Sequence, residues 1–185
     1  MPHEPSDSMP LSLDMPSQAT RSDASCKDEV VQLFEQLRQP LLRYLRTFGI
    51  SLQDSEEAVQ ETFLALFRHL QRGKPRTNLH GWLFTVAHRL GQKRRQLQAR
   101  HEGLDSIEWP DPTPSQEANM AGEQTREQVR ALIRALPEQD QQCLYLRGEG
   151  LRYRQISEVL GISLGSVAAS LSRSLTKIAR ITKSK

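Results

Sequence analysis

The chain has 185 residues, of which 37% are hydrophobic and 25% are charged, and its formal net charge is +3. This composition disfavours one large hydrophobic core and favours two small helical units with much exposed surface. The sequence has no run of about 18 apolar residues that could span a membrane, and its first residues lack the basic and then apolar order of a secretion signal, so a cytoplasmic location is expected.

A tail precedes the first predicted helix. Residues 1–25 are rich in Pro, Ser and Asp and show no apolar period, so we expect them to form a disordered tail. From Asp28 onward, apolar residues recur at steps of three or four, which predicts a helix that Gly49 closes. Pro40 lies inside this pattern and predicts a kink or a break there.

Two further helices complete the first predicted domain, residues 26–100. Asp54 precedes Glu57 by three residues, a spacing typical of a capping box in which Asp54 caps the start of a helix. That helix carries one apolar stripe and ends at the turn residues 73–76. The next helix begins near residues 77–78, carries a second apolar stripe and continues into basic residues. Shared stripes of this kind predict a small helical bundle.

Charge is distributed unevenly along the chain. The segment between Thr62 and His101 has no acidic residue but nine Lys and Arg, which makes it suited to binding a polyanion. The sign reverses over residues 101–122, where acidic residues and prolines predict a flexible, fairly extended linker. After Glu158 acidic residues are absent again and the C-terminus is basic.

Residues 123–185 predict a second helical domain. Two helices are separated by Leu136 and Pro137, where the proline suits the first turn of the following helix. Gly148 and Gly150 end that helix.

Residues 153–167 have the pattern of a helix-turn-helix. Apolar residues give the first helix a buried face, Gly161 permits the positive-φ turn, and Ser163 caps the second helix. An ordinary helical hairpin is the alternative, but the basic C-terminal helix favours contact with a DNA major groove and its phosphates. The predicted DNA-binding residues here are Arg152, Ser163, Ser166, Ala169, Ser170, Arg173 and Lys177.

The basic segment 88–95 continues a helix that begins with the aromatic residues Trp82 and Phe84. Aromatic rings beside Arg and Lys suit a nucleic acid strand whose bases are unstacked. The alternative is a solvated charged face with Trp82 in the core.

Metal sites and enzymatic sites have little support. Cys26 and Cys143 are far apart, with no CxxC pair and no nearby His cluster, so we expect two reduced thiols, Cys26 in the tail and Cys143 in a helix. The sequence has neither a phosphate-cradling Gly-rich loop nor an HExxH motif, and His69, His80 and His88 are expected to be surface or core residues. The sequence therefore predicts no catalytic residue, no metal and no cofactor.

Four segments in this order resemble the extracytoplasmic-function (ECF) sigma factors of bacterial RNA polymerase. They are residues 54–63 (DSEEAVQETF), residues 81–87 (GWLFTVA), the Leu-Pro pair at 136–137, and residues 150–153 (GLRY) with the helix-turn-helix. The resemblance extends over nearly everything from Asp28 to Arg180. It implies an all-α fold of two small helical domains, sigma region 2 and sigma region 4, joined by the flexible acidic linker.

The resemblance implies that the helix from Asp54 to Leu66 binds the clamp helices of core polymerase. Gln60 and Glu61 are the strongest candidates, because an amide and a carboxylate opposite the apolar stripe can pair with Arg and polar groups of a partner helix. A solvent-facing polar stripe is the alternative. The residues assigned to core polymerase are Asp54, Glu57, Gln60, Glu61 and Leu64.

The resemblance also assigns the loop at residues 73–80 and the following helix to melting and reading the minus-ten element, and the second domain to the minus-thirty-five duplex. Relatives commonly have Asn and Asp where this chain has Arg89 and Lys93, and often Val-Lys-Ser-Arg-Leu where residues 167–171 read VAASL. Upstream binding is therefore expected to be weaker or differently specified. The residues assigned to the minus-ten region are Lys74, Arg76, Asn78, Trp82, Arg89, Lys93, Arg94 and Arg95.

The expected function is that of a sigma factor, which docks on the clamp helices and flap of core polymerase and directs it to a promoter, while the polymerase performs the chemistry. An anti-sigma factor is a possible further partner. Two alternatives remain open. One is a two-domain helix-turn-helix regulator that acts without polymerase. The other is a sigma mimic that sequesters an anti-sigma factor, against which the basic block argues.

Overall fold

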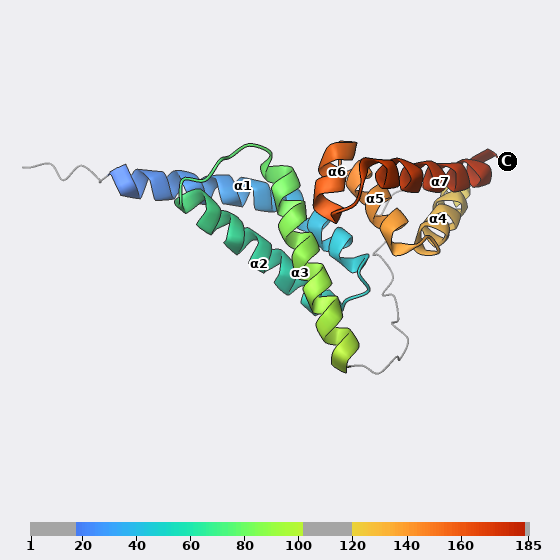
Figure 1. Ribbon diagram of the computed structural model, residues 1–185, viewed down its shortest axis with the longest axis horizontal. Coiled ribbons are helices and arrows are strands. Elements are labelled where there is room, and N and C mark those ends of the chain that lie inside the picture. The colour runs from blue at the N-terminus through green and yellow to red at the C-terminus, as the bar shows by residue number, and fades with distance from the viewer. Residues whose placement is uncertain (1–17, 102–119, 184–185) are drawn as a thin grey trace, which may run out of the picture.

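The structure is a computed structural model that describes residues 18–101 and 120–183 (Figure 1). Within those ranges the chain forms seven helices and no strand, which confirms the predicted all-α class. The predicted acidic linker falls almost wholly on residues 102–119, outside the described part of the chain. The N-terminal group of helices is α1 (Gln18–Arg46), α2 (Leu52–Gln71) and α3 (Leu79–His101). The C-terminal group is α4 (Met120–Arg134), α5 (Glu138–Gly148), α6 (Tyr153–Leu160) and α7 (Leu164–Lys183).

Helix α1 starts earlier than the sequence predicted. It begins at Gln18, so the predicted disordered tail is wrong for residues 18–25, and residues 1–17 lie outside the described ranges. An established helix extends at low cost, because each added residue gains one backbone hydrogen bond. The absence of an apolar period therefore did not end the helix.

Both cysteines are free and buried, but one prediction about them was wrong. Cys26 lies in α1 rather than in a tail, and its side chain is 1% exposed. Its sulfur is 3.6 Å from Nη2 of Arg76. Cys143 lies in α5 as expected and is fully buried.

Pro40 lies inside α1 without ending it, so of the predicted kink or break, the break does not occur. Leu37 and Leu41 on either side of it are buried, as is Leu45 one turn further on. A proline inside a helix costs about 3 kcal/mol, whereas burying one leucine side chain contributes roughly 1.5–3 kcal/mol. Several buried leucines therefore outweigh the proline.

Helix α2 is capped three residues earlier than the sequence predicted. Its N-cap is Ser51, whose hydroxyl accepts a hydrogen bond from the Asp54 backbone N–H (3.0 Å) and donates one to the Asp54 carboxylate (2.6 Å). Asp54 is therefore the third residue of the helix and not its N-cap. Ser and Asp both suit a helix N-terminus, so the spacing of Asp54 and Glu57 alone misplaced the start.

A buried polar pair holds the back of α3 against α1. The Tyr44 hydroxyl lies 2.8 Å from Nδ1 of His88, and both residues are buried. The rings of Phe48 and His88 meet edge to face with centroids 5.3 Å apart. Gly91 allows this approach, because a Cβ there would lie 3.0 Å from the Phe48 ring.

The turns of the C-terminal group follow the prediction closely. Pro137 is the N-cap of α5, one position before the helix, and α5 ends at Gly148. Gly161 has a φ of +67° between α6 and α7, in the left-handed region that favours glycine. The Ser163 hydroxyl accepts a hydrogen bond from the Ser166 backbone N–H (3.1 Å), which confirms the predicted cap of α7.

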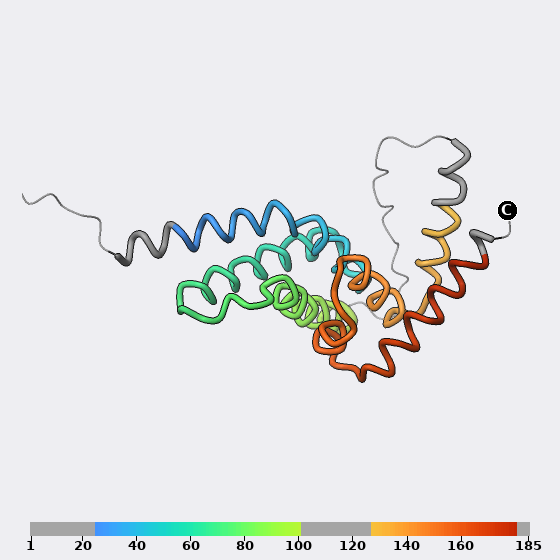
Figure 2. Tube along the Cα trace, turned by 90° about the horizontal axis from the view of Figure 1, so that it is seen from above, coloured from blue at the N-terminus to red at the C-terminus, as the bar shows by residue number. Residues whose placement is uncertain are grey.

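The two groups pack against each other through α3 with α6 and through α1 with α5. The Tyr145 hydroxyl of α5 donates a hydrogen bond to the Pro40 carbonyl of α1 (3.2 Å). In Figure 2, α4 and α7 lie side by side at the end of the molecule opposite the start of α1. Because α6 packs on α3 and Gln155 of α6 hydrogen-bonds to Asn78 just before α3, the helix-turn-helix sits beside the N-terminal end of α3.

Candidate nucleic-acid interface

One face of α2 is exposed and carries four of the five residues that the sequence singled out there. Glu57, Gln60, Glu61 and Leu64 are all exposed, and their spacing of three or four residues places them on one side of the helix. Leu64 is 47% exposed and adds an apolar side chain to this face. The fifth residue, Asp54, is half-buried at the start of the helix and belongs to its cap.

Arg94 of α3 faces this surface of α2 rather than the solvent. Its Nη2 lies 2.7 Å from Glu61 and 3.8 Å from Glu57, and its side chain is only 13% exposed. The structure thus joins two residues assigned to core polymerase with one assigned to DNA. Bound in this way, Arg94 partly neutralises the two carboxylates and holds their side chains in place.

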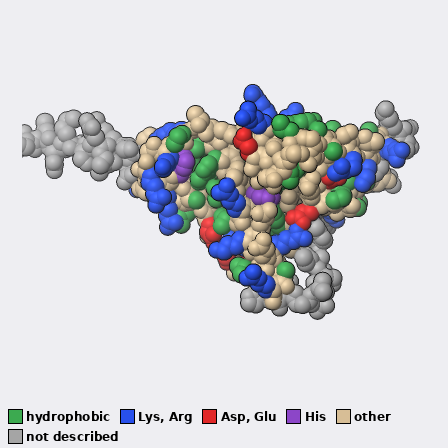
Figure 3. Space-filling view, viewed as in Figure 1, with side chains coloured by type: hydrophobic (Ala, Val, Ile, Leu, Met, Phe, Trp, Pro, Cys, Tyr) green, Lys and Arg blue, Asp and Glu red, His purple; other side chains and the backbone are tan. Residues whose placement is uncertain are grey.

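Arg89 and Lys93 form the outward cationic face of α3. Both are exposed, they are four residues apart, and no acidic residue in the described ranges forms an ion pair with either. On the face shown in Figure 3, Lys and Arg side chains gather over the loop after α2 and recur down α3. This surface can hold a polyanion without first breaking an ion pair.

The loop before α3 divides its predicted residues between surface and packing. Lys74 is exposed, whereas Arg76 forms an ion pair with Glu29 of α1. Trp82 is half-buried, and its indole lies against the ring of His69 with centroids 4.7 Å apart. Trp82 therefore has a packing role in this structure.

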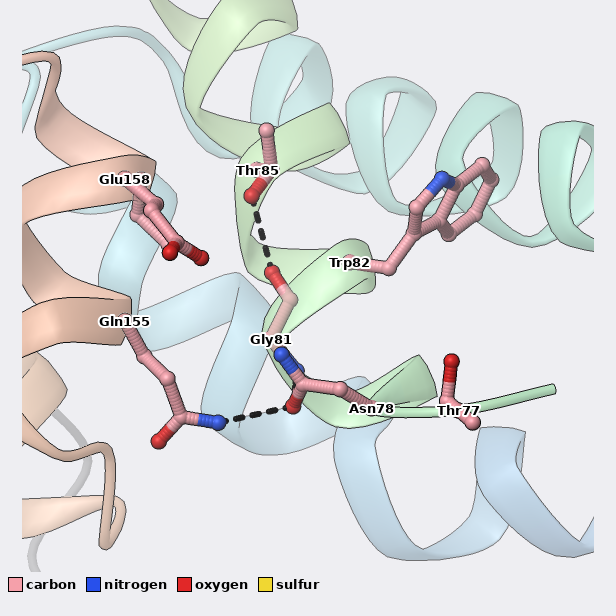
Figure 4. A pocket seen from close by; sticks show the side chains of 8 residues that line it. Thr77, Asn78, Gly81, Trp82, Thr85, Gln155 and Glu158 are labelled. Atoms are coloured by element: carbon pink, nitrogen blue, oxygen red, sulfur yellow. Dashed lines mark hydrogen bonds between the residues drawn. The ribbon is translucent and has the colours of Figure 1, made fainter. Parts of the chain in front are cut away.

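A cavity of about 190 Å³ separates the start of α3 from α6 (Figure 4). Asn78 stands at its edge with a φ of +56°, and its Oδ1 accepts hydrogen bonds from the Gly81 backbone N–H (3.3 Å) and from Nε2 of Gln155 (2.8 Å). Trp82 points away from α6. The cavity is lined by Thr77, Asn78, Gly81, Trp82, Thr85, Gln155, Glu158 and Val159.

The contacts between the two groups include residues that the sequence assigned to DNA. Arg95 of α3 forms an ion pair with Glu138 of α5, and Arg43 of α1 lies 3.9 Å from Glu149. With Asn78 bound to Gln155, two of the eight residues assigned to the minus-ten region contact the C-terminal group here. Sequence reasoning had no signal for these partners, because they lie more than 40 residues apart.

Helix α7 departs from the predicted outward face at one residue. Ser163 and Ala169 are exposed and Ser166 is half-buried, but Ser170 is fully buried, so its predicted position toward a major groove is wrong. The Ser170 hydroxyl accepts hydrogen bonds from Nε2 of Gln139 and from Nη2 of Arg173, each at 3.2 Å.

Arg173 is anchored to α5 through a nearly buried carboxylate. Its Nη2 and Nε donate to the two oxygens of Asp140 at 2.7 and 3.3 Å, and the Asp140 side chain is 2% exposed. Burial tends to raise the pKa of Asp140, but the hydrogen bonds from Arg173 and Ser170 and the charges of Arg173 and Lys177 bring it below the ordinary value. The predicted residues Arg152 and Lys177 are both exposed.

The sequence prediction left out several exposed residues of α7, among them Leu164 (51% exposed), Ala168 and Ser172. Ala168 and Ser172 lie on the outward face beside Ala169. The helical period around the buried Val167 and Leu171 could have placed both of them there.

Two kinds of feature are absent from the described part of the chain. No single helix in it is long and apolar enough to cross a membrane, and the one pair that is, α6 with α7, is bent by 107°. The same residues contain no group of three or more His, Cys, Asp or Glu side chains that could hold a metal ion.

Two protein-family models match the chain, and several known proteins resemble it in sequence. Sigma-70 region 2 matches residues 33–101, and Sigma-70, region 4 matches residues 126–178. The chain is 27% identical over 169 residues to the RNA polymerase sigma factor YlaC of Bacillus subtilis (strain 168), which covers 86% of this chain and 95% of that protein. It is 29% identical over 130 residues to the ECF RNA polymerase sigma factor SigE of Mycolicibacterium smegmatis, which covers 65% of this chain and 48% of SigE. It is 26% identical over 145 residues to EcfG of Rhodopseudomonas palustris (strain TIE-1), also an ECF RNA polymerase sigma factor. That match covers 74% of this chain and 78% of EcfG.

Among the solved structures that share the fold are two complexes. The sigma factor RpoE of Bartonella quintana, in complex with the anti-sigma factor NepR, has a TM-score of 0.68 at 18% identity, over 85% of this chain and 98% of that one. CnrH, in complex with the cytosolic domain of CnrY, has a TM-score of 0.57 at 18% identity, over 90% of this chain and 96% of CnrH. These likenesses support the arrangement of helices described above.

Proposed function

Because the chain belongs to the sigma factors of the ECF subfamily, we propose that its exposed faces divide between core RNA polymerase and two promoter elements. Core polymerase and promoter DNA are the partners of a sigma factor. The proposed division assigns residues 26–100 to core and minus-ten binding, residues 101–122 to the linker, and residues 123–185 to minus-thirty-five binding.

The outer face of α2 is the proposed surface for core polymerase. Gln60 and Glu61 supply an amide and a carboxylate beside the exposed Leu64, a combination that suits a helix carrying Arg and one apolar side chain. Glu61 keeps a second carboxylate oxygen for a partner, because Arg94 takes only Oε1. This exposed mixed face is the observation that carries the proposal.

The outward face of α3 is the proposed contact with the opened strand of the minus-ten element. Arg89 and Lys93 are exposed cations that can neutralise phosphates. Lys74 in the preceding loop extends this surface. Helices α6 and α7 bind the upstream duplex as a helix-turn-helix, with Arg152 and Lys177 beside the phosphates.

The protein's other properties follow from this role. Core polymerase performs phosphoryl transfer, so the sigma factor needs no catalytic residue, metal or cofactor of its own. The site of action is the cytoplasm, where polymerase and DNA are found. An anti-sigma factor is a further proposed partner, because the fold matches RpoE in its complex with NepR.

Reconstituted transcription with purified core polymerase tests the function as a whole. The protein should direct promoter-dependent transcripts from a genomic template library and should co-purify with core polymerase. A protein that binds DNA but neither binds core nor yields transcripts would be a regulator that acts alone. One that binds neither core nor DNA would be a sigma mimic.

Charge reversal on α2 tests the assignment of the core-binding face. Glu61→Lys should weaken association with core polymerase while helix content stays unchanged by circular dichroism. Glu56→Lys is the matched control, since Glu56 is an exposed glutamate on another side of the same helix, near Arg38. Equal loss in both variants, or no loss in Glu61→Lys, would contradict the assignment. Glu61→Gln checks the result without placing a lysine beside Arg94.

A further inference from the structure

Arg94 of α3 lies between two carboxylates of α2. Glu57 and Glu61 are four residues apart on one side of that helix, where like charges repel each other. Nη2 of Arg94 lies 2.7 Å from Oε1 of Glu61 and 3.8 Å from Oε2 of Glu57. The Arg94 side chain is 13% exposed, whereas those of Glu61 and Glu57 are 53% and 51% exposed. Packing therefore restrains the arginine, while a partner can reach both carboxylates.

The two carboxylates differ in what they can offer to a partner. Both oxygens of Glu57 face groups of this chain, since Oε1 accepts a hydrogen bond from Nε2 of Gln53 (3.2 Å) and Oε2 faces Arg94. At Glu61 the arginine takes only Oε1. Glu61 is thus oriented through one oxygen and can offer the other to a partner.

A carboxylate oriented in this way favours a long-lived contact with a partner helix. An exposed glutamate samples several rotamers, and fixing it on association costs free energy that opposes binding. The ion pair with Arg94 restricts Glu61 before the partner arrives. The arginine also lowers the negative charge of the face, but salt at physiological strength screens long-range attraction beyond about 8 Å. Loss of that attraction acts mainly on the association rate, so the ordering of Glu61 should decide the lifetime of the complex.

We propose that Arg94 is a positioning residue for core polymerase, which acts by holding Glu61 in the conformation that meets a cationic side chain of the partner helix. Its neighbours in the basic segment had placed Arg94 among the residues assigned to the minus-ten element. The inference rests on the proposed function, because it concerns how the outer face of α2 binds core polymerase. Within that face it makes Glu61 the main ionic contact and gives Glu57 the role of fixing Arg94.

Dissociation of the full chain from core polymerase, measured without DNA, tests this role. Arg94→Gln should raise the dissociation rate about threefold, because Glu61 is then no longer ordered in advance. The association rate should stay the same or increase, since the face becomes more negative. Arg94→Lys keeps a cation, so its dissociation rate should lie between those of the parent protein and Arg94→Gln. Arg38→Gln is the matched control, because it breaks a pair with Glu56 on another side of α2, and it should leave both rates unchanged.

A double-mutant cycle with Glu61 separates positioning from a general structural role. In a Glu61→Ala background no carboxylate remains to be held, so adding Arg94→Gln should change the dissociation rate by a factor of about one. If Arg94 only supported the packing of α3 on α2, the same substitution would raise the dissociation rate equally in both backgrounds. Equal increases in the two backgrounds would therefore overturn the inference.

The remaining outcomes separate the inference from the function beneath it. A dissociation rate that is unchanged or lower in Arg94→Gln overturns the positioning role, as does a rate in Arg94→Lys equal to that in Arg94→Gln. Both results leave the core-binding face standing if Glu61→Lys still weakens association. Core binding by Glu61→Ala as tight as that of the parent protein would instead remove the α2 assignment itself, and the positioning role with it.

Discussion

Helices α3 and α7 both face nucleic acid under the proposed function, but the composition of their outward faces differs. The outward face of α3 carries the long cations Arg89 and Lys93 one turn apart, whereas α7 exposes Ala168, Ala169 and Ser172 before its cations Arg173 and Lys177. Phosphate contacts give affinity that depends on salt and not on sequence. Contacts to base edges give discrimination. Under the proposed function α3 therefore meets an opened strand mainly through cations, whereas α7 meets duplex DNA with small side chains and cations together.

The two helices also differ in the polar pair that holds each from behind. Behind α3, His88 meets the Tyr44 hydroxyl in an aromatic environment. Behind α7, the carboxylate of Asp140 meets the guanidinium of Arg173. One pair is neutral and the other is charged, so acid should affect the two groups of helices at different pH values.

The largest expected effect is acid sensitivity of the N-terminal group. Burial and the charge of Arg89 lower the pKa of His88 to about 4, below its ordinary value near 6.5. As pH falls, His88 is protonated in the unfolded chain near pH 6.5 but in the folded protein only near pH 4. The stability due to neutral His88 is therefore complete above pH 6.5 and declines progressively toward pH 4. The loss should reach about 3 kcal/mol in the free energy of unfolding, measured by urea titration at a series of pH values.

His88→Gln should remove most of this pH dependence, whatever its effect on overall stability. A smaller slope should remain from His80, whose pKa is also lowered by burial and partly restored by Glu149. The measurement therefore compares slopes rather than absolute stabilities. An identical slope in His88→Gln and the parent protein would contradict the assignment.

The C-terminal group should respond only at lower pH. Although burial acts to raise the pKa of Asp140, its hydrogen bonds with Arg173 and Ser170 leave that pKa below the ordinary value. The stability it contributes is therefore present above the ordinary carboxyl pKa and is lost as pH falls through the lowered one. Hydrogen exchange at pH 5 should show protection reduced in α1 and α3 but retained in α5 and α7.

Neutralising the outward cations of α3 should have the next largest effect. The double variant Arg89→Gln/Lys93→Gln should weaken promoter binding by the holoenzyme roughly tenfold and lower the slope of log K against log salt by about 2. Arg94→Gln is the matched control in the same basic segment. It should leave the slope unchanged, because Arg94 already pairs with Glu61 and Glu57. An equal drop in slope for Arg94→Gln would remove the distinction between these arginines.

Much of this fold could be predicted from the sequence, because apolar periods and turn residues act locally. Gly161 and Ser163 were placed correctly at the turn and cap of the helix-turn-helix. The wrong predictions concern competition between effects of similar size. Pro40 disfavours a helix, but the burial of neighbouring leucines outweighs it. Asp54 can cap a helix, but Ser51 lies in the cap position.

The site was less predictable than the fold, because charge patterns do not reveal partners. Arg94 and Lys93 are adjacent in the sequence, yet one is paired across to α2 and the other is exposed. Ser170 is polar and was expected outside, but a buried position is acceptable to a hydroxyl with hydrogen-bond partners. The partners of these side chains are distant in sequence: Arg94 and Glu61 are 33 residues apart, as are Arg173 and Asp140. No local sequence pattern reveals pairs at that separation.

The two serine caps allow a direct comparison of the two groups. Ser51 caps α2 and Ser163 caps α7, each through a hydrogen bond from the backbone N–H three residues later. Ser51→Ala and Ser163→Ala should each cost about 1 kcal/mol in the free energy of unfolding. If the groups unfold separately, each variant should shift only its own transition in a urea titration followed by hydrogen exchange. A shift of both transitions in either variant would show that the groups unfold as one unit.

The smallest expected effect concerns the contact between the groups. Arg95 and Glu138 form an ion pair across it, but their side chains are 48% and 36% exposed, so the coupling should be only about 0.5 kcal/mol. A double-mutant cycle with Arg95→Gln and Glu138→Gln measures this coupling through urea unfolding, and 1 M salt should abolish it. Additive effects at low salt would mean that α3 and α5 do not meet through this pair in solution. Arg95 would then join Arg89 and Lys93 as a cation available to DNA, and the contrast between α3 and α7 would become larger.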